Sequence, residues 1–408
     1  MRGTTQARSP GTDTGGRRPR RRAAAAILAG VLGAAAVPGA AAAAAARPAG
    51  APPARTSTTG ASTTEASTTE ASTTGTHPGS RRSAASWRIV KTTRGRDLPG
   101  ITAVTTTGPG HAWAFASTLA RPVAWRLTGR RWAAVPFPGQ AGDLVTAAAS
   151  SAPDNVWAFT ARPAGAGQAL RWDGRRWVTV RRFTQAIGDA VVLGPADVWV
   201  FGQPLSPGRL GVWHYNGRTW RRYPAAGALT GGSALGPDSI WAVGGKTAAH
   251  WNGHTWSRTS LARVLPRNTQ FCRPSADKVL ARSATDVWAV GAGHCEDERG
   301  PFYLMHFNGS RWRLVSQSAR YGEPLQVVRD GSGGLWIPAA AGFPGTFAML
   351  HYTGGHLQRA MLPLPGTRLT VDAVAHVPGS AVTFGGGESH PAGQAGTKQS
   401  AVILRYGG

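Results

Sequence analysis

A tryptophan-centred segment recurs along this chain at intervals of 42 to 48 residues. A seventh copy, "AVTFGGG", has Val382 where we expect the tryptophan. A fixed period of this length is typical of solenoids and propellers, so it constrains the fold more than any property of the composition. The six copies that carry the residue are centred on Trp113, Trp157, Trp199, Trp241, Trp288 and Trp336.

Each period predicts four short strands. Around Trp288, apolar runs occupy 277–283, 287–291, 302–308 and 310–316. Asn308-Gly309 is typical of a two-residue hairpin, because both positions of a type I′ turn need positive φ. Similar glycine hairpins precede Trp132, Trp177, Trp220 and Trp256. Four antiparallel strands repeated seven times predict an all-β, seven-bladed β-propeller.

The tryptophans follow this repeat, and fourteen of the sixteen fall on it. We interpret them as packing between blades rather than as a binding surface. The predicted structural set is Trp87, Trp113, Trp132, Trp157, Trp177, Trp199, Trp220, Trp241, Trp256, Trp288, Trp312 and Trp336.

The two ends of the repeat array complement each other. The seventh copy runs through its third strand at 401–408, and "SAASWRIVKT" (83–92) reads as a fourth strand with no blade before it. We therefore expect the strand around Trp87 to complete the last blade and to remove an open sheet edge.

The repeat resembles a known family. "SIWAVGGKTAAHWNGHTW" (239–256) is similar to a kelch repeat of galactose-oxidase-like propellers, with Gly244-Gly245, Trp251 and Trp256 in place, and Gly385-Gly386 fits too. The hairpins also resemble the Asp-box turns of sialidase-type propellers, although only Gly-x-x-Trp is kept. The resemblance covers about 87–408 and implies the fold alone, because propellers host many unrelated functions.

The N-terminal region predicts export. "RRPRRR" (17–22) precedes an alanine-rich apolar stretch (23–46), so residues 1–46 are expected to be a signal peptide, with paired arginines that suggest the twin-arginine route. An uncleaved anchor is the alternative. Residues 47–86 are rich in Ala/Pro and then Ser/Thr and predict a disordered linker. The propeller is then expected to occupy 87–408. We expect contact with the membrane only through the signal peptide, during export.

The charge is strongly positive, at +26 overall and +20 outside residues 1–46. One reading is a coding preference for arginine over a solvated surface. The other is attraction to anionic polymers outside the cell, such as wall phosphates or acidic glycans. We expect no specific nucleic-acid partner.

Two cysteines are too few for a disulfide framework or a four-cysteine zinc site. Cys272 precedes the first strand of the fifth blade, and Cys295 follows its second strand. Because these strands are antiparallel neighbours, the positions come together at one end of the hairpin, and we predict a disulfide.

The chain carries no recognisable enzyme motif, and we expect neither a cofactor nor a metal. His214, His250, His306 and His351 share one repeat position on the third strand. Sevenfold rotation separates neighbouring blades at that radius by roughly 13 Å, whereas one zinc ion needs every ligand nitrogen within about 2.1 Å. We therefore interpret these histidines as part of the repeat.

The least repetitive loops, 292–301 and 386–399, lie at the same end of the predicted propeller. Loops on a rigid scaffold carry function more often than the scaffold does. The candidate ligand residues are His294, Glu296, Asp297, Glu298, Glu388 and His390. The alternative is that these loops are simply solvated.

The sequence therefore predicts a secreted or envelope-associated, monomeric propeller that binds an extracellular glycan, anionic polymer or protein without catalysis. A carbohydrate-active hydrolase or lyase on the loop-rich end is the alternative. A purely structural envelope protein is the third.

Overall fold

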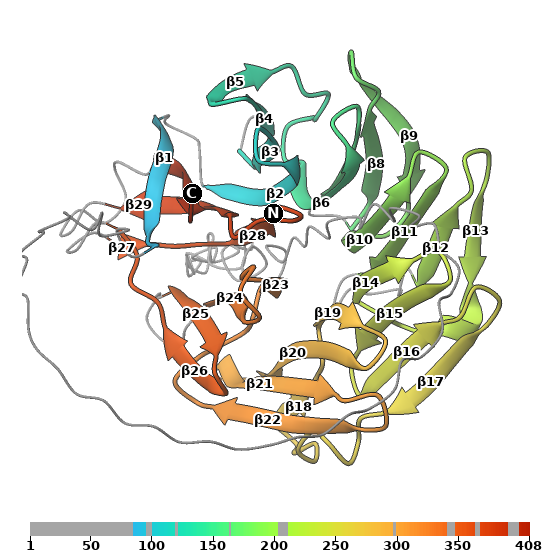
Figure 1. The fold of residues 1–408 in the computed structure, drawn as a ribbon. Helices are drawn as coiled ribbons and strands as arrows, with labels where there is room; N and C mark the ends of the chain where they lie inside the picture. Colours follow the sequence, from blue (N-terminus) through green and yellow to red (C-terminus); the bar gives the residue numbers. More distant parts are fainter. Residues whose placement is uncertain are drawn as a thin grey trace, which may run out of the picture.

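The computed structural model describes residues 85–94, 100–118, 121–162, 165–202, 211–296, 299–340, 347–363, 368–390 and 400–408. The expected signal peptide, and the linker up to residue 84, lie outside these ranges. No helix in the described ranges is long and apolar enough to cross a membrane. Seven twisted sheets are arranged around a central axis (Figure 1).

The first four blades have four strands each, numbered along the chain. Blade 1 contains β2 (Ile101–Gly108), β3 (His111–Ala116), β4 (Val123–Thr128) and β5 (Arg131–Val135). Blade 2 contains β6 (Leu144–Ala152), β7 (Asn155–Ala161), β8 (Gly167–Trp172) and β9 (Trp177–Phe183). Blade 3 contains β10 (Ile187–Gly194), β11 (Asp197–Gly202), β12 (Val212–Tyr215) and β13 (Trp220–Tyr223), followed by the short 3₁₀ helix Pro224–Ala226. Blade 4 contains β14 (Gly231–Gly236), β15 (Ser239–Gly244), β16 (Thr247–Trp251) and β17 (Trp256–Ser260).

Blades 5 and 7 each carry one additional short strand. Blade 5 contains β18 (Cys272–Pro274), β19 (Lys278–Ser283), β20 (Asp286–Cys295), β21 (Arg299–Phe307) and β22 (Trp312–Ser318). Blade 6 contains β23 (Val328–Arg329), β24 (Leu335–Ala340), β25 (Phe347–Thr353) and β26 (His356–Arg359). Blade 7 contains β27 (Arg368–Leu369), β28 (Ala373–His376), β29 (Thr383–His390), β30 (Ser400–Tyr406) and β1 (Trp87–Arg94).

The seven-bladed propeller predicted from the repeat is confirmed. In blades 1 to 4 and in blade 6 the strands follow sequence order outward from the axis, and each pairs antiparallel with the next. In blades 5 and 7 the added strands β18 and β27 pair with the second strands β20 and β29, and β1 forms the outer edge of blade 7. The innermost strands β2, β6, β10, β14, β19, β23 and β28 surround the axis (Figure 1). The two faces of each sheet pack against the neighbouring blades.

The hydrophobic core consists of seven clusters, and each lies between two neighbouring blades. The cluster between blades 1 and 2, for example, joins Trp113 to Trp172 and Trp177. The ring of Trp113 lies 5.1 Å from that of Trp172 and 5.2 Å from that of Trp177, between centroids. The repeated tryptophans therefore pack between blades, as the sequence predicted, and contribute a large buried area at each interface.

The N-terminal strand closes the ring. β1 pairs antiparallel with β30 along its length, from Trp87 opposite Tyr406 to Arg94 opposite Ser400. Trp87 is only 4% exposed, and its ring lies 5.2 Å from Trp336 of blade 6. The predicted closing strand is confirmed, and it also fills the core between blades 6 and 7.

One assignment in the seventh copy was wrong. Phe384, not Val382, occupies the tryptophan position, because it pairs with Arg405 just as Trp113 pairs with Arg126 in blade 1. Val382 is buried two residues earlier, against blade 1. Residues two apart in a strand face the same side, so the hydrophobic pattern could not distinguish the two positions.

The glycine hairpins are present but shifted by one residue from the prediction. In blade 5, Asn308 N–H donates to Arg311 O at 3.3 Å, so Gly309 and Ser310 form the centre of the turn. Gly309 has φ +92°, and Asn308 Oδ1 accepts hydrogen bonds from the N–H groups of Ser310 and Arg311. Asn308 is therefore the first residue of the turn, and its side chain stabilises the turn as in an Asx turn.

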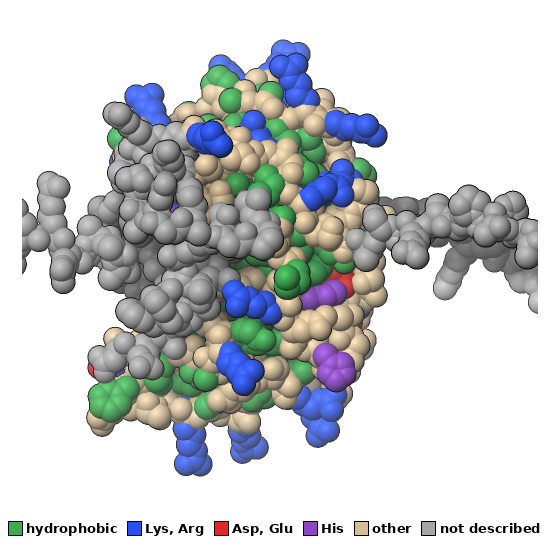
Figure 2. Space-filling view, turned by 90° about the vertical axis from the view of Figure 1, so that its left-hand side faces the viewer, with side chains coloured by type: hydrophobic (Ala, Val, Ile, Leu, Met, Phe, Trp, Pro, Cys, Tyr) green, Lys and Arg blue, Asp and Glu red, His purple; other side chains and the backbone are tan. Residues whose placement is uncertain are grey.

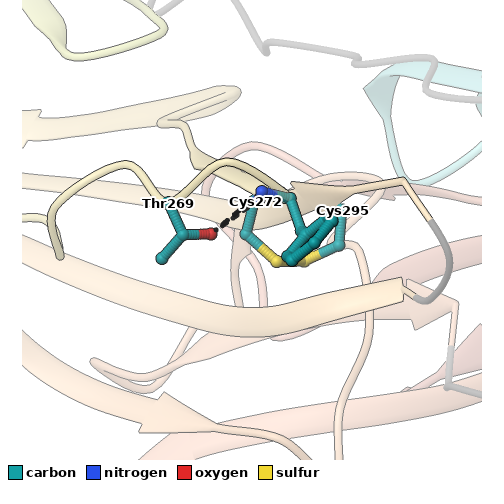
Figure 3. Close-up of a disulfide and its surroundings, with 4 residues drawn as sticks. Thr269, Cys272 and Cys295 are labelled. Atoms are coloured by element: carbon teal, nitrogen blue, oxygen red, sulfur yellow. Dashed lines mark hydrogen bonds between the residues drawn. A yellow bond between two sulfur atoms is a disulfide. The ribbon is translucent and has the colours of Figure 1, made fainter.

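The predicted Cys272–Cys295 disulfide is confirmed (Figure 3). The two residues face each other across the β18–β20 pair, with Cα atoms 4.0 Å apart. Thr269 Oγ1 accepts the N–H of Cys272 at 2.9 Å and fixes the approach of the chain. The bridge fastens the connection between blades 4 and 5 to the end of β20.

Replacement of Trp87 by alanine tests the closing strand. We expect a loss of about 3–5 kcal/mol in the free energy of unfolding, because a large buried side chain leaves a cavity between blades 6 and 7. Urea unfolding followed by circular dichroism measures it. Trp132→Ala is the matched control, since Trp132 holds the same repeat position on β5 but is only partly buried. A loss at Trp87 no larger than at Trp132 would contradict this account of ring closure.

Candidate functional site

The two ends of the propeller differ in their connections. Inner strands begin, and second strands end, on one side, which we call the loop face. The tight turns between first and second strands, and between third and fourth, lie on the other side, the turn face. On the loop face β20 and β29 extend beyond their blades and pair with the added strands β18 and β27. Blades 5 and 7 are therefore built up on this face, with blade 6 between them.

In blade 5, His294 is the predicted ligand residue with the most defined surroundings. Its Nε2 lies 3.4 Å from Oδ1 of Asp277, which also accepts the hydroxyl of Ser275 at 2.5 Å. Burial alone lowers the pKa of His294, but the hydrogen bond and charge of Asp277, with the charge of Glu323, outweigh it and raise this pKa. The imidazole therefore binds its proton more readily than a free histidine and is held by Asp277 at the edge of the loop face.

The acidic residues beside His294 are less constrained. The N–H of Glu296 donates to Phe271 O at 2.9 Å, and the Glu296 side chain is exposed. Asp297 and Glu298 lie outside the described residues. The proposed acidic patch of blade 5 is therefore represented in the structure only by Glu296.

In blade 7, Glu388 and His390 form an ion pair at 2.9 Å. Directly beside them lies Asp372, which sequence reasoning missed. Asp372 is 4% exposed, and burial, reinforced by the negative charge of Glu388, raises its pKa well above the ordinary 3.8. Its Oδ2 lies 3.4 Å from the Thr370 hydroxyl, and its Oδ1 has no hydrogen-bond partner among the described residues.

The strand register gives the signal that would have found Asp372. It lies three residues before the inner-strand residue that pairs with the tryptophan position, where other blades carry Thr102, Thr146 and Thr230. Those threonines donate to a backbone carbonyl of the next blade, as Thr102 does to Val145 O at 2.8 Å. Blade 5 carries Asp277 at the same position, so blades 5 and 7 both have an acid where blades 1, 2 and 4 have a hydroxyl.

A buried ion pair lies near the axis. Lys278 Nζ lies 3.7 Å from Asp189 Oδ2 and donates to Gly188 O at 3.0 Å, so blade 5 contacts blade 3 past blade 4. The contact needs Gly231 of blade 4, where an added Cβ would lie 2.9 Å from the Cα of Lys278. Burial still raises the pKa of Asp189, despite Lys278. Loss of either partner alone would leave an uncompensated buried charge, which costs about 3–5 kcal/mol.

The four repeated histidines are each used within their own blade. Each stacks on the tryptophan of its second strand, with ring centroids 4.0 to 4.4 Å apart. Each also contacts a side chain at the turn: His214 with Asp197, His306 with Asp286, His351 with Asp330, and His250 with Ser239. Among the described residues no three His, Cys, Asp or Glu side chains form a group that could hold a metal ion.

The rim of the propeller carries a different kind of surface. The seven outermost strands, β5, β9, β13, β17, β22, β26 and β1, contain eleven basic residues and no Asp or Glu. Figure 2 shows part of this rim, where Lys and Arg side chains extend from the wall and acidic side chains are scarce. The eleven are Arg88, Lys91, Arg94, Arg131, Arg181, Arg182, Arg221, Arg222, Arg258, Arg313 and Arg359.

Comparison with known proteins supports the fold and no narrower assignment. No family model matches the chain, and no curated protein does. Among solved structures, YCF48 bound to D1 peptide is similar over 78% of this chain and 96% of its own, with 12% identity and a TM-score of 0.51. The WD40 β-propeller domain of Doa1 is similar over 78% and 97%, with 9% identity and a TM-score of 0.51.

A third similar structure is an enzyme, virginiamycin B lyase from Staphylococcus aureus. It covers 76% of this chain and 98% of its own, with 11% identity and a TM-score of 0.50. These similarities agree with the seven-bladed β-propeller fold of this chain. They do not single out the kelch type, because the matched propellers belong to several families.

The sequence-predicted site residues thus fall into two groups on one face. Glu388 and His390 contact each other in blade 7, whereas His294 and Glu296 lie in blade 5, across blade 6. The structure adds Asp372 and Asp277 as buried acids beneath the two groups.

The raised pKa of Asp372 gives a pH test. The folded protein binds the proton of Asp372 more tightly than the unfolded chain does. The free energy of unfolding therefore falls as the pH rises from about 3.8, the ordinary pKa, to the raised pKa of the folded protein. Asp372→Asn cannot ionise, so this pH-dependent fall in the free energy of unfolding is absent from the variant. We expect its thermal midpoint to exceed wild type by a few degrees at pH 7 and to match it near pH 3, measured by scanning calorimetry.

The exposed Asp154 gives the control, since Asp154→Asn should change the midpoint little at any pH. A lower midpoint for Asp372→Asn at pH 7 would show instead that the ionised carboxylate is stabilised by the fold.

Proposed function

We propose that this chain is an exported, non-catalytic binding module whose ligand is an anionic polymer of the cell envelope, held at the arginine-rich rim. The observation that carries the proposal is the absence of any acidic residue from the seven outermost strands, against eleven basic ones. A coding preference for arginine accounts for many arginines, but not for the lack of acids in these strands.

Arginine suits such a ligand. Its guanidinium is always charged and binds phosphate and carboxylate groups with two parallel hydrogen bonds. Arg182, Arg258 and Arg313 are exposed on blades 2, 4 and 5 and take part in no ion pair among the described residues. A belt of such groups around the propeller offers many equivalent contacts to a flexible polyanion.

Export is part of the same proposal. The predicted signal peptide (1–46) and linker (47–86) would carry the propeller outside the cell and hold it away from a wall. A disulfide persists most readily in an oxidising compartment, so the Cys272–Cys295 bridge supports this location. We further propose that the repeat is related to the kelch type and that the protein acts as a monomer.

The rim proposal is tested by cosedimentation of residues 47–408 with purified cell walls and with polyphosphate-coated beads. We expect Arg182→Glu/Arg258→Glu/Arg313→Glu to bind at least tenfold less than wild type at about 0.05 M salt, and the difference to shrink at about 0.5 M salt as charges are screened.

Arg263→Glu/Arg267→Glu/Arg320→Glu is the matched control, because it changes the net charge equally at exposed positions on the loop face. Equal losses in both triple variants would mean that net charge alone drives binding. Unchanged binding in the rim variant would exclude the rim, and a protein or neutral glycan ligand on the loop face would then replace it.

A second candidate function is a carbohydrate-active hydrolase or lyase on the loop face. The observation in its favour is Asp372, a buried carboxyl with a raised pKa beside Glu388 and His390, since perturbed acids cluster at catalytic sites. The similarity to a propeller lyase is compatible with it.

Assay of a polysaccharide panel separates the two functions. The enzyme hypothesis expects product release that Asp372→Asn abolishes, while Asp154→Asn leaves the rate unchanged. No turnover of any polysaccharide, or equal turnover in both variants, would remove this candidate.

A further inference from the structure

A pocket of about 470 Å³ opens on the turn face where blades 5, 6 and 7 meet. It lies at the opposite end of the propeller from the candidate residues on the loop face, and the rim proposal does not involve it. Its lining includes two arginines and a histidine, Arg282, Arg329 and His376, together with Ser380, Ala381 and four glycines.

The pocket coincides with a break in the repeat. Arg329 and His376 pair with the residue before the tryptophan position in blades 6 and 7, so they are equivalent in neighbouring blades. The same register positions in the other blades are small or apolar. They are Thr106, Ser150, Val192, Ala234 and Ala281. Among these seven positions, only the two adjacent copies in blades 6 and 7 carry a basic side chain.

Arg329 lacks a carboxylate partner. Its Nη2 donates to Ala281 O at 3.1 Å and to Arg282 O at 3.0 Å, which aims the guanidinium, but no described acid lies within ion-pair distance of it. Burial and the charge of Arg282 lower the pKa of Arg329. A half-buried cation in this situation gains from an anion brought by a ligand.

Arg282 is held in place at the pocket wall. Its Nε lies 3.2 Å from Asp286 Oδ2, and its Nη1 donates to Gly333 O at 2.7 Å. That carboxylate is shared, because Asp286 Oδ1 contacts His306 at 2.9 Å. Arg282 is therefore balanced by Asp286, and the charge of the neighbouring Asp330 also acts on His376, so Arg329 is the cation that a ligand can reach without displacing an ion pair.

His376 adds a hydrogen-bonding group with no fixed charge. It is 6% exposed, and its Nδ1 has no hydrogen-bond partner among the described residues. Burial and the neighbouring Arg329 lower its pKa, so the ring is neutral at pH 7.

Backbone forms the rest of the wall. Gly331 has φ +84°, and a Cβ there would lie 2.5 Å from Ser380 O and 2.7 Å from the Cα of Ala381. The glycines thus let the turns of blades 6 and 7 approach closely, and main-chain atoms line part of the pocket. A volume of about 470 Å³ is that of a site for a small molecule.

We propose that this pocket binds a single oxyanion, the phosphate or carboxylate group of a small ligand, through Arg329 with support from Arg282 and His376. The guanidinium geometry fits both groups. The proposal is independent of polymer binding at the rim, since none of these residues belongs to an outermost strand.

Isothermal titration calorimetry of residues 47–408 at about 0.15 M sodium chloride tests the pocket, with inorganic phosphate and with acetate as separate probes. We expect saturable binding of one of them per chain, and the probe that binds identifies the group. Arg329→Gln should weaken the affinity at least tenfold, whereas Arg263→Gln, an exposed position on the loop face, should leave it unchanged.

Because Arg329→Gln can also disturb folding, a second pair of variants uses the exposed Ala381. Ala381→Glu places a competing carboxylate at the opening and should abolish binding, while Ala381→Gln, of the same size, should reduce it far less. The proposal is overturned if neither probe binds the wild type, or if binding persists equally in Ala381→Glu and Ala381→Gln.

Discussion

Closure of the ring is the constraint on which the rest of this structure depends. Each blade buries its apolar faces only against its two neighbours, and the seven core clusters each lie between two blades. The pairing of β1 with β30 joins segments from opposite ends of the described chain and completes the seventh blade. Without it, Trp87 would leave the core between blades 6 and 7, and β30 would be an open edge.

The repeat uses its own polar residues to build this ring. Each repeated histidine stacks on a tryptophan and contacts an acid or a serine of the same blade, and asparagine side chains stabilise the outer hairpins. These residues look chemically suggestive in the sequence but serve the architecture. The positions that depart from the repeat have more freedom to serve function. They include Asp277 and Asp372 on the loop face and Arg329 with His376 on the turn face.

The basic residues of the two proposed sites also differ in their exposure to solvent. Most basic residues of the outermost strands are exposed to solvent, where their interactions with other charges are sensitive to salt. Arg329 is half-buried against backbone carbonyls, so an anion there would be bound by direct contact and less affected by screening. The two proposed sites therefore differ in physical character as well as in place.

The sequence by itself determined the number of blades, the four-strand unit, the closing strand and the disulfide, because period, alternation and turn residues are local properties. It also named Glu388 and His390 as candidate ligand residues, and these two side chains contact each other in the structure. It could not separate Val382 from Phe384, since residues two apart face the same side. Only the tertiary structure decided which groups lie together, such as Asp372 beside Glu388, Lys278 with Asp189 across blade 4, and Arg329 near His376. Those contacts join residues of different strands or blades, and their geometry depends on how the ring brings those strands together.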